Sequence, residues 1–544
     1  MNLKYTLSAL AIAASLSACG GDDGSNGTSA TLLQLKVAGT YTPPGNPANF
    51  FDESAAEIVA YDARQHRLFV VNANDITVDV LDMSDPSMPS LMSTIDATAE
   101  GGVANSVAVS SKLVAVAIEA NTKTDPGKVV FYNSTSFAKV GEATVGALPD
   151  MLAFTPDGNK VLVANEGEPN DDYSVDPEGS VSIIDITDGV DNLTVNTASF
   201  TSFNTQKTSL ISSGVRIFGP GASVAQDLEP EYIAISEDGS TAWASLQENN
   251  AIAIIDIDNA TVDSIVPLGF KDHRIFGNEL DASNRDDRIN IRNWPVFGMY
   301  QPDTIASYSF NGETYIVTAN EGDARDYDTW SEEIRVKDMV LTDDIGAAGI
   351  QADEDLGRLN VTSTLGVSNG CDPSLLTTDP EVDCEYDALY AYGARSFSIR
   401  AADGTLVFDS GNDFERITAA RNGEFFNSNN DENDFDSRSD DKGPEPEGLA
   451  LGNINGQTFA FIGLERVGGI MVYNISNPQA PQFVQYINNR DFSGDPSLGT
   501  SGDLAPEGLT FVGAKQSPSG KPLLIVGNEV SGTTTVYEID VIEL

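Results

Sequence analysis

Histidine, cysteine and basic residues are scarce in this chain of 544 residues. It has two histidines and three cysteines, and its 30 lysines and arginines stand against 82 aspartates and glutamates, for a formal net charge of −52. A surface of this sign repels phosphate backbones, which excludes nucleic acid as a partner. The few histidines and cysteines cannot build a zinc site without other ligands. Metal binding by this chain must therefore rely on oxygen ligands.

Long apolar segments are missing after the N-terminus, where no run reaches the roughly 18 residues needed to span a bilayer. The N-terminus itself carries Lys4, an apolar stretch over residues 7–16 and small residues before Cys19. This is the layout of a secretory signal. We therefore expect an exported protein whose body lies outside the membrane.

The end of this segment, Leu16-Ser17-Ala18-Cys19, resembles a lipobox, in which Cys19 becomes the lipidated first residue of the mature protein. The alternative is an ordinary signal peptide with a cysteine by chance. We expect residues 1–18 to be a lipoprotein signal peptide and residues 19–30 to be a lipidated, flexible tether. The resemblance implies a protein of the outer membrane or the cell surface, with the membrane as a partner through the lipid.

Two cysteines remain for the body of the chain, Cys371 and Cys384, in a loop rich in proline and aspartate. Exported proteins meet oxidising conditions, so we expect a local disulfide between them. Two free thiols and a thiolate metal site are the alternatives, and the metal site would need more ligands than this segment supplies.

A repeated unit covers most of the remaining chain. Each copy begins with an acidic residue and a short apolar strand, turns on Asp-Gly or Asn-Gly, continues with a second apolar strand and closes on a third one that ends in a string such as Ile-Ile-Asp-Ile. Seven copies begin near Ala55, Val103, Asp150, Glu231, Asp303, Glu447 and Glu507. Short strands joined by tight hairpins at this period are typical of propeller blades. The sequence thus predicts an all-β fold, a single seven-bladed β-propeller over residues 31–544, in which an early strand near residues 32–41 closes the ring.

Three insertions interrupt the repeat, at about residues 265–301, 321–388 and 420–445. They are rich in aspartate, asparagine and arginine, and none has enough apolar residues for a core of its own. We expect them to be long loops on one face of the propeller. Within the third, residues 427–441 alternate aspartate, asparagine and serine as calcium loops do, but lack the glycine and final glutamate of an EF-hand. This segment is therefore a candidate calcium loop or simply a mobile loop.

Acidic residues recur at two positions of the repeat, the start of the first strand and the end of the second. The first position holds Asp150, Glu231, Asp303, Glu447 and Glu507, and the second holds Glu119, Glu166, Glu248, Glu321, Glu465 and Glu529. Because the first strand lines the channel and the second lies antiparallel beside it, these carboxylates should meet at one mouth. So many like charges need cations, or some of the carboxylates must keep their protons.

Carboxylates without histidine or thiolate favour calcium or magnesium, and calcium tolerates irregular multi-carboxylate sites better. We predict Ca²⁺ as the cofactor, with its ligands among Glu166, Glu231, Glu321, Asp323, Glu447 and Glu507. The alternative is that each of these carboxylates caps backbone amides of the neighbouring repeat. Both roles are compatible.

Three arginines stand out near the ends of the repeats, at Arg325, Arg395 and Arg466. Arginine offers a bidentate fork to phosphate or carboxylate, so these residues are candidates for binding an anionic substrate beside calcium. The alternative is that they pair with neighbouring aspartates and glutamates. No phosphate-binding glycine loop, Gly-x-Ser-x-Gly string or zinc-protease motif is present in the sequence.

Several strings in the second half of the chain resemble a known family. They are Asn320-Glu321-Gly322-Asp323-Ala324-Arg325-Asp326-Tyr327, Gly393-Ala394-Arg395-Ser396-Phe397-Ser398-Ile399, Asp409-Ser410-Gly411-Asn412-Asp413-Phe414-Glu415 and the two Pro-Glu-Gly-Leu strings at 446 and 506. With them, nearly the whole mature chain resembles the choice-of-anchor I family, which includes a mesenchyme-specific surface glycoprotein and bacterial proteins labelled alkaline-phosphatase-like. The resemblance implies a seven-bladed propeller and suggests calcium. It carries over no nucleophile.

Two functional hypotheses follow from the sequence. The first is a calcium-dependent phosphoesterase of the cell surface that acts on small phosphate esters, in which metal ions polarise the phosphate and activate water. The second is a non-catalytic calcium-binding propeller that acts in adhesion, or in contact with matrix or mineral.

Overall fold

The structure, a computed structural model, describes residues 31–343, 345, 349–371 and 384–543. The signal peptide, the lipidated Cys19 and the tether predicted over residues 1–30 lie outside the described residues. No helix within the described part of the chain has the length and apolar character needed to cross a membrane.

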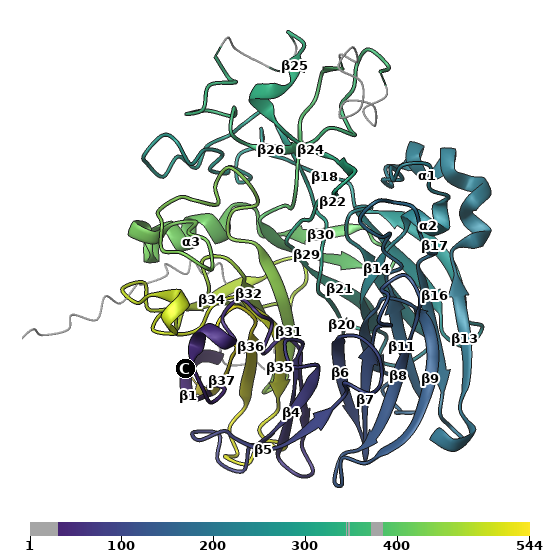
Figure 1. Ribbon diagram of the computed structural model, residues 1–544. Helices are drawn as coiled ribbons and strands as arrows, with labels where there is room; N and C mark the ends of the chain where they lie inside the picture. The colour runs from purple at the N-terminus through teal and green to yellow at the C-terminus, as the bar shows by residue number, and fades with distance from the viewer. Residues whose placement is uncertain (1–30, 344, 346–348, 372–383, 544) are drawn as a thin grey trace, which may run out of the picture.

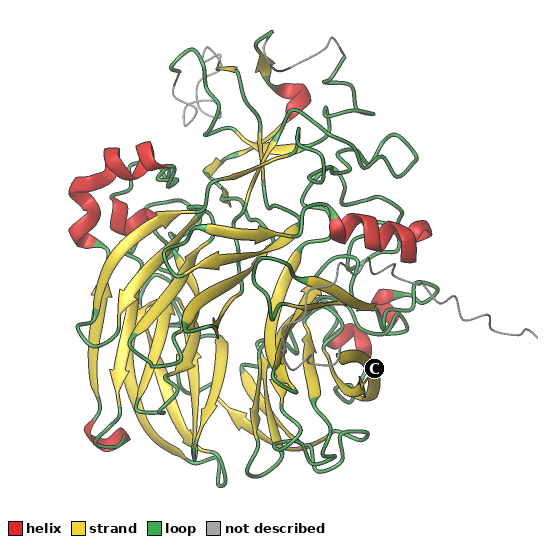
Figure 2. Ribbon diagram, turned by 180° about the vertical axis from the view of Figure 1, so that it is seen from behind, coloured by secondary structure: helices red, strands yellow, loops and turns green. Residues whose placement is uncertain are grey.

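Seven antiparallel sheets of four strands make up the main body within the described residues (Figures 1 and 2). Sheets 1 to 3 are β2 (Val59–Asp62), β3 (Arg67–Asn72), β4 (Thr77–Asp82) and β5 (Ser90–Asp96); β6 (Ala104–Ser110), β7 (Leu113–Ile118), β8 (Pro126–Asn133) and β9 (Lys139–Ala147); β10 (Pro149–Phe154), β11 (Lys160–Asn165), β12 (Ser180–Asp185) and β13 (Thr194–Ser199). Sheets 4 and 5 are β14 (Pro230–Ile235), β15 (Thr241–Leu246), β16 (Ala251–Asp256) and β17 (Thr261–Pro267); β20 (Ile305–Phe310), β21 (Glu313–Asn320), β29 (Ser396–Ala401) and β30 (Leu406–Asp409). Sheets 6 and 7 are β31 (Pro446–Ile454), β32 (Gln457–Leu464), β33 (Ile470–Asn474) and β34 (Gln482–Ile487); β35 (Pro506–Val512), β36 (Leu523–Asn528), β37 (Thr533–Glu543) and β1 (Thr31–Tyr41).

The sheets form a closed ring. Their first strands contact one another in a cycle that runs β2, β6, β10, β14, β20, β31, β35 and back to β2. The early strand β1 pairs antiparallel with β37 from Thr31 opposite Glu543 to Tyr41 opposite Thr534, so the two ends of the propeller share sheet 7. This confirms the all-β propeller and the closing role predicted for the strand near residues 32–41.

The apolar core is divided among the interfaces between neighbouring sheets. Seven clusters of buried apolar side chains each join two successive sheets around the ring. Second strands such as β11 are therefore buried almost throughout, whereas outer strands such as β5 and β13 are largely exposed. This explains the uniformly apolar second strand of each repeat, because it faces a neighbouring sheet on both sides.

Two of the insertions differ from the loops expected from the sequence. The first and second insertions together form a mixed five-stranded sheet at the upper end of Figure 1, in the order β18 (Phe270–Asp272), β19 (Phe297–Met299), β28 (Tyr390–Ala391), β26 (Asn360–Thr362) and β24 (Glu333–Arg335). Trp294 and Val296 of the first insertion pack with Leu356, Leu359 and Tyr386 of the second in one buried cluster. Neither insertion has enough apolar residues alone, but the two combine theirs into a shared core.

Short elements in the insertions and in other connections between strands complete the described structure. Two small ladders are β22 (Asp326–Tyr327) with β23 (Trp330–Ser331) and β25 (Val340–Leu341) with β27 (Glu385–Tyr386). The helices are α1 (Lys207–Ser213), α2 (Val224–Asp227) and α3 (Asp413–Arg421), and the 3-10 turns are η1 (Pro47–Asn49), η2 (Val190–Asn192), η3 (Thr201–Gln206), η4 (Val336–Asp338), η6 (Gly423–Phe425) and η7 (Pro496–Leu498). Cys371 and Cys384 form the predicted disulfide, with their Cα atoms 5.4 Å apart.

Candidate metal centre at the channel mouth

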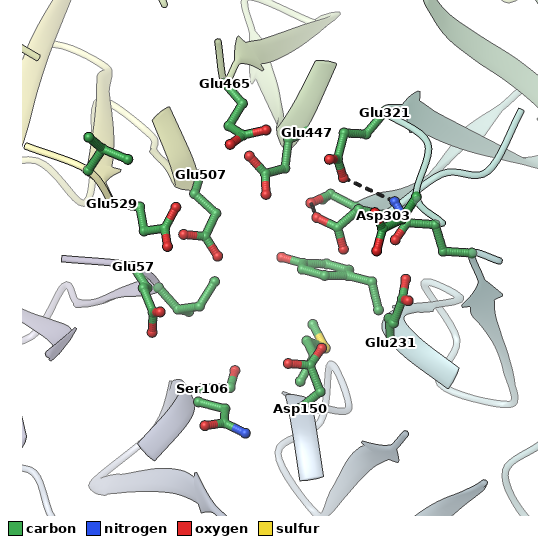
Figure 3. A pocket seen from close by; sticks show the side chains of 18 of the residues that line it. Glu57, Ser106, Asp150, Glu231, Asp303, Glu321, Glu447, Glu465, Glu507 and Glu529 are labelled. Carbon is green, nitrogen blue, oxygen red and sulfur yellow. Dashed lines mark hydrogen bonds between the residues drawn. The ribbon is translucent and has the colours of Figure 1, made fainter. Parts of the chain in front are cut away.

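One end of the central channel opens into a cavity of about 580 Å³ that is lined by residues of sheets 2, 3, 4, 6 and 7 and by the segments that flank the strands of sheets 1 and 5. Figure 3 shows this cavity from close by, with carboxylates from around the ring directed toward a common centre. Twelve carboxylates line it, against one lysine and one arginine: Asp52, Glu57, Asp150, Glu166, Glu231, Asp303, Glu321, Asp323, Glu447, Glu465, Glu507 and Glu529, with Lys442 and Arg466. The cavity therefore has a large excess of negative charge.

A recurring backbone feature brings these carboxylates together. In four sheets, a proline at the start of the first strand lies opposite the last residue of the second strand, as Pro149 lies opposite Asn165 and Pro506 opposite Asn528. The register shifts after this proline, which marks a β-bulge, and the residue that follows it is the acidic one. Bulges bend a strand and change the direction of its side chains. The convergence predicted from the repeat is thus present in the structure.

One side of the cavity, the paired wall, combines Glu321, Glu445 and Glu465 with two cations. Lys442 Nζ lies 2.9 Å from Glu321 Oε1 and 3.0 Å from Glu445 Oε2, and Arg466 lies 3.0 Å from both Glu445 and Glu465. Glu445 is fully buried, and Lys442, Arg466 and Arg438 hold its pKa well below the ordinary value against the opposing effect of burial. Glu321 and Glu445 thus have cationic partners within the protein, whereas the buried Oε2 of Glu465 has no hydrogen-bond partner and burial raises the pKa of Glu465 despite Arg466.

The rest of the ring, the unpaired wall, has no such partners. It consists of Glu57, Asp150, Glu166, Glu231, Glu507 and Glu529, none of which forms an ion pair within the described residues. The buried Oε2 atoms of Glu231 and Glu507 have no hydrogen-bond partner, and the same holds for Glu447 between the two walls. A buried polar atom without a partner costs about 1–3 kcal/mol, more when it is charged. Such atoms indicate a ligand.

Without a cation, the unpaired wall should hold protons at neutral pH. Burial and the neighbouring Glu529 raise the pKa of Glu57 to about 8, and burial and Glu168 raise the pKa of Asp150 to about 7. Burial, followed by repulsion from nearby carboxylates, raises the pKa of Glu231 and of Glu507 well above the ordinary range. Burial and mutual repulsion therefore disfavour the charged forms of these carboxylates more strongly than the surrounding protein stabilises them.

Three groups of carboxylates have ligand atoms within 4.8 Å of one another among the described residues: Glu57, Glu507 and Glu529; Asp303, Glu321 and Glu447; and Glu321, Glu445 and Glu465. The third group is the paired wall, where Lys442 and two arginines already supply positive charge. The first two groups fit a hard divalent cation better, because their donors are all carboxylate oxygens and few of their charges are compensated.

All six residues predicted as metal ligands line the cavity: Glu166, Glu231, Glu321, Asp323, Glu447 and Glu507. Glu119, which occupies the equivalent repeat position in sheet 2, does not line it, and Glu119 Oε1 instead accepts a hydrogen bond from the Val103 amide at 3.3 Å. Glu119 therefore caps an amide of its own repeat, and not one of the neighbouring repeat as the alternative reading of these carboxylates proposed.

Two of the three arginines predicted to bind an anion are used elsewhere. Arg325 is 3% exposed and pairs with Asp227 and with Glu229, the latter at 2.8 Å, while Arg395 is 4% exposed and pairs with Glu415 at 2.6 Å. The alternative of pairing with neighbouring acids therefore holds for both, and the geometry removes them from the anion-binding set. Only Arg466 lines the cavity, and it also contacts Glu445 and Glu465.

Sequence reasoning placed Asp303, Glu465 and Glu529 at the mouth without predicting them as ligands, and it did not identify Glu57, Glu445 or Lys442. Glu57 and Asp303 belong to the groups whose ligand atoms are close enough to share a metal ion. Asp303 stands at a repeat position, whereas Glu57 lies two residues after the repeat start predicted near Ala55 and just before β2. Lys442 lies in the third insertion, outside the repeat, and no spacing in the sequence could have placed it beside Glu321.

Comparisons with solved structures find propellers and other large proteins at low identity. The β-propeller domain of Cps50 (Swd1) from Myceliophteria thermophila matches with a TM-score of 0.43 and 9% identity, over 93% of this chain and 99% of that one. Hydrazine synthase of Kuenenia stuttgartiensis matches with a TM-score of 0.44 and 12% identity, over 91% and 96% of the two chains.

Two curated proteins share sequence with this chain. Gigasin-3a of Magallana gigas is 31% identical over 206 residues, which cover 35% of this chain and 66% of that protein. The mesenchyme-specific cell surface glycoprotein of Strongylocentrotus purpuratus is 29% identical over 285 residues, which cover 46% of this chain and 35% of that protein. The matches thus span 66% and 35% of the two relatives' own lengths.

Residues 57–478 match the choice-of-anchor I domain, which is most of the chain and includes the cavity residues from Glu57 to Glu465. The chain belongs to the choice-of-anchor I family.

Proposed function

We propose that this chain is an exported, lipid-anchored surface protein that binds calcium at the mouth of its channel. The observation that carries the proposal is the unpaired wall with the adjacent Glu447, where half-buried and buried carboxylates have no ion-pair partner within the described residues and Glu231, Glu447 and Glu507 each leave an oxygen without a hydrogen bond. A divalent cation would supply both the missing charge and the missing contacts.

Calcium is the cation that suits this donor set best. Glu57, Glu507 and Glu529 come from two neighbouring repeats, and their ligand atoms lie within 4.8 Å of one another in a cavity of about 580 Å³. Magnesium demands near-ideal octahedral geometry and keeps several waters, whereas calcium accepts six to eight oxygens in flexible arrangements. The residues present fit calcium, with Glu57, Glu507 and Glu529 holding one ion and Asp303 and Glu447 contributing to a second.

Support for the location comes from the sequence and from one relative. The lipobox-like string that ends in Cys19 favours an outer-membrane or cell-surface lipoprotein, and the echinoderm relative is named as a cell surface glycoprotein. Adhesion, or contact with surface matrix or mineral, would follow if calcium in the open cavity keeps free coordination positions for a partner's anionic groups.

The direct test is a calcium titration of the purified mature chain by calorimetry, with Glu507→Gln as the test variant. Glu313→Gln is the matched control, because Glu313 is exposed at the start of β21, the strand after which Glu321 enters the cavity. We expect wild type and Glu313→Gln to bind calcium equally and Glu507→Gln to bind at least one ion more weakly. Equal titrations for all three proteins would reject calcium binding by the unpaired wall.

A second candidate function is calcium-dependent hydrolysis of small phosphate esters. The observation that favours it is that Lys442 and Arg466 line the same cavity as the unpaired carboxylates, so a phosphate could contact fixed cations and metal together. The loss of Arg325 and Arg395 from the anion-binding set weighs against it. Hydrolysis of p-nitrophenyl phosphate by the mature chain, with calcium and with chelator, separates the two. Turnover that chelator abolishes supports the enzyme, and a chelator-sensitive melting temperature without turnover supports the binding protein.

A further inference from the structure

A second group of buried acids lies outside the channel, where the third insertion packs against α3 and the first insertion. We call it the insertion cluster, and it consists of Asp281, Glu415, Asn427, Ser428 and Asp436, all at most 2% exposed. None of them lines the channel cavity. The cluster therefore has to be explained separately from the carboxylates of the mouth.

The charges of the insertion cluster do not balance. Glu415 is neutralised by Arg395, whose NH1 lies 2.6 Å from Glu415 Oε1. Asp281 and Asp436 form no ion pair within the described residues, and after burial the charge of Asp281 is the largest influence on the pKa of Asp436. Burial raises the pKa of Asp281 to about 7 and that of Asp436 to about 8. Asp281 accepts hydrogen bonds from the Ser283 and Asn290 amides, but no cation compensates either aspartate, and buried charges of one sign are costly without a counter-ion.

Three oxygen atoms of the cluster are also left without a hydrogen-bond partner. They are Asp436 Oδ2, Asn427 Oδ1 and Ser428 Oγ. The orientation of the Asn427 amide is set by its nitrogen, which donates to Glu415 Oε1 at 3.1 Å and to Ser439 Oγ at 2.9 Å. A flipped amide would place its oxygen against the Glu415 carboxylate, so the free Asn427 oxygen follows from the local charges.

Backbone hydrogen bonds hold these donors side by side. The Asp436 amide donates to the Phe426 carbonyl at 2.7 Å, and the Arg438 amide donates to the Asn427 carbonyl at 2.8 Å. Ser439 Oγ, which receives the Asn427 amide nitrogen, in turn donates to Asp436 Oδ1. The two arms of the third insertion therefore bring an amide oxygen, a hydroxyl and a carboxylate to one place.

We propose that the insertion cluster is a second calcium site, with Asp281, Asp436, Asn427 and Ser428 as ligands. Its donors are carboxylate, amide and hydroxyl oxygens, which are hard ligands that calcium prefers, and the charge of one divalent ion equals that of the two uncompensated aspartates. The insertion cluster shares no ligand with the metal centre of the channel.

The position of this site gives it a structural consequence. The same loop continues to Lys442 and Glu445, which form part of the paired wall, and Arg395 binds the carbonyls of Ser439 and Asp441 within it. An ion between Asp281 of the first insertion and Asp436 of the third would fix the loop that delivers Lys442 to the channel. Calcium bound at the insertion cluster would therefore stabilise the position of Lys442 at the channel mouth.

The test is to count calcium ions bound by the mature chain, by calorimetry and by equilibrium dialysis, in wild type, Asp436→Asn and Asp281→Asn. Asp434→Asn is the matched control, since Asp434 is exposed and lies two positions from Asp436. We expect each of the two test variants to bind one calcium ion fewer than wild type and the control to bind the same number. An unchanged number in both test variants would overturn the proposal.

Two further measurements separate this site from the channel and from misfolding. Glu507→Gln should weaken a different ion, so the double variant Glu507→Gln/Asp436→Asn should lose both. In chelator, Asp436→Asn should melt no lower than wild type, because it removes an unpaired buried charge. Calcium should protect residues 427–441 from limited proteolysis in wild type and in Asp434→Asn but not in Asp436→Asn. Calcium protection in Asp436→Asn equal to that in wild type would contradict the site.

Discussion

The two walls of the channel mouth answer the same electrostatic problem in different ways. On the paired wall, Lys442 and Arg466 lie at salt-bridge distance from Glu321, Glu445 and Glu465, so the protein supplies cations to these carboxylates itself, although one oxygen of Glu465 stays without a hydrogen bond. On the unpaired wall, no basic residue of the described chain reaches the carboxylates. The comparison teaches that acidic residues at equivalent repeat positions need not have equivalent roles, because their role depends on which insertion reaches them.

The largest expected effect is that of pH, because it acts on every unpaired carboxylate at once. The folded pKa of Glu57 is raised by burial to about 8 from 4.5, and that of Asp150 to about 7 from 3.8. The folded state therefore binds more protons than the unfolded state between these values, and the calcium-free protein should lose stability as pH rises from about 4 to about 8. Urea unfolding in chelator at several pH values measures this.

Glu445 on the paired wall should behave in the opposite sense. Its folded pKa is depressed by Lys442, Arg466 and Arg438, so the stability it contributes is present above its ordinary pKa of 4.5 and is lost as pH falls through the depressed value.

Saturating calcium should flatten the loss of stability that the unpaired wall causes between pH 4 and 8. A calcium-free protein whose stability rises over that range would contradict the assignment of the unpaired wall.

Removing the cation of the paired wall should give the next largest effect. Lys442→Met leaves Glu321 and Glu445 with fewer partners, and breaking a buried pair by removing one member typically costs about 3–5 kcal/mol. Chemical unfolding in chelator measures the loss in free energy of unfolding. Calcium should restore part of it, because the paired wall then resembles the unpaired one. A Lys442→Met protein as stable as wild type in chelator would show that the lysine is not needed there.

Neutralising the unpaired wall should have a smaller effect of opposite sign. In chelator, Glu507→Gln should be at least as stable as wild type, because it removes a charge that repels Glu57 and Glu529. In calcium, wild type should gain about 2.7 kcal/mol at a free calcium concentration one hundred times the dissociation constant, and the variant should gain less. Thermal unfolding with calcium and with chelator gives both differences. A destabilised variant in chelator would mean that Glu507 has a protein partner.

The smallest of these effects should come from Arg466. Its side chain is 23% exposed, and Glu445 keeps Lys442 and Arg438 when it is removed. Arg466→Gln should therefore cost about 1–3 kcal/mol, the range for leaving a buried hydrogen-bonding group unpaired. Glu313→Gln, on the exposed end of β21, should stay within about 0.5 kcal/mol of wild type by the same unfolding measurement. A cost for Arg466→Gln above that of Lys442→Met would reverse the order of importance within the paired wall.

The repeat positions could be predicted from the sequence because they depend on local features. A proline, an acidic residue and an apolar strand specify where Asp150 or Glu507 lies relative to the channel, whatever the rest of the chain does. The closure by β1 and the disulfide between Cys371 and Cys384 could be predicted for similar reasons, since an unpaired sheet edge and two cysteines in an exported chain each allow few outcomes.

The insertions could not be predicted because their structure depends on contacts distant in sequence. Arg325 was assigned to an anion, but Asp227 and Glu229, which lie near α2 about a hundred positions earlier, hold it in buried ion pairs. The apolar residues of the first and second insertions are too few when each insertion is taken separately, and only their combination makes a core. Lys442 reaches Glu321 through a loop whose course no periodic pattern records.

The bulge that follows the first-strand proline makes the channel mouth modular. Sheet 2 has the same shift of register, between Ala104 and Ser106, but places the neutral Asn105 at the position where other sheets carry an acid. In these five sheets the first strand therefore directs a side chain to the ring through a local backbone feature, independently of its neighbours. The number and kind of groups at the mouth can change one repeat at a time, by single substitutions, while the ring that presents them stays the same.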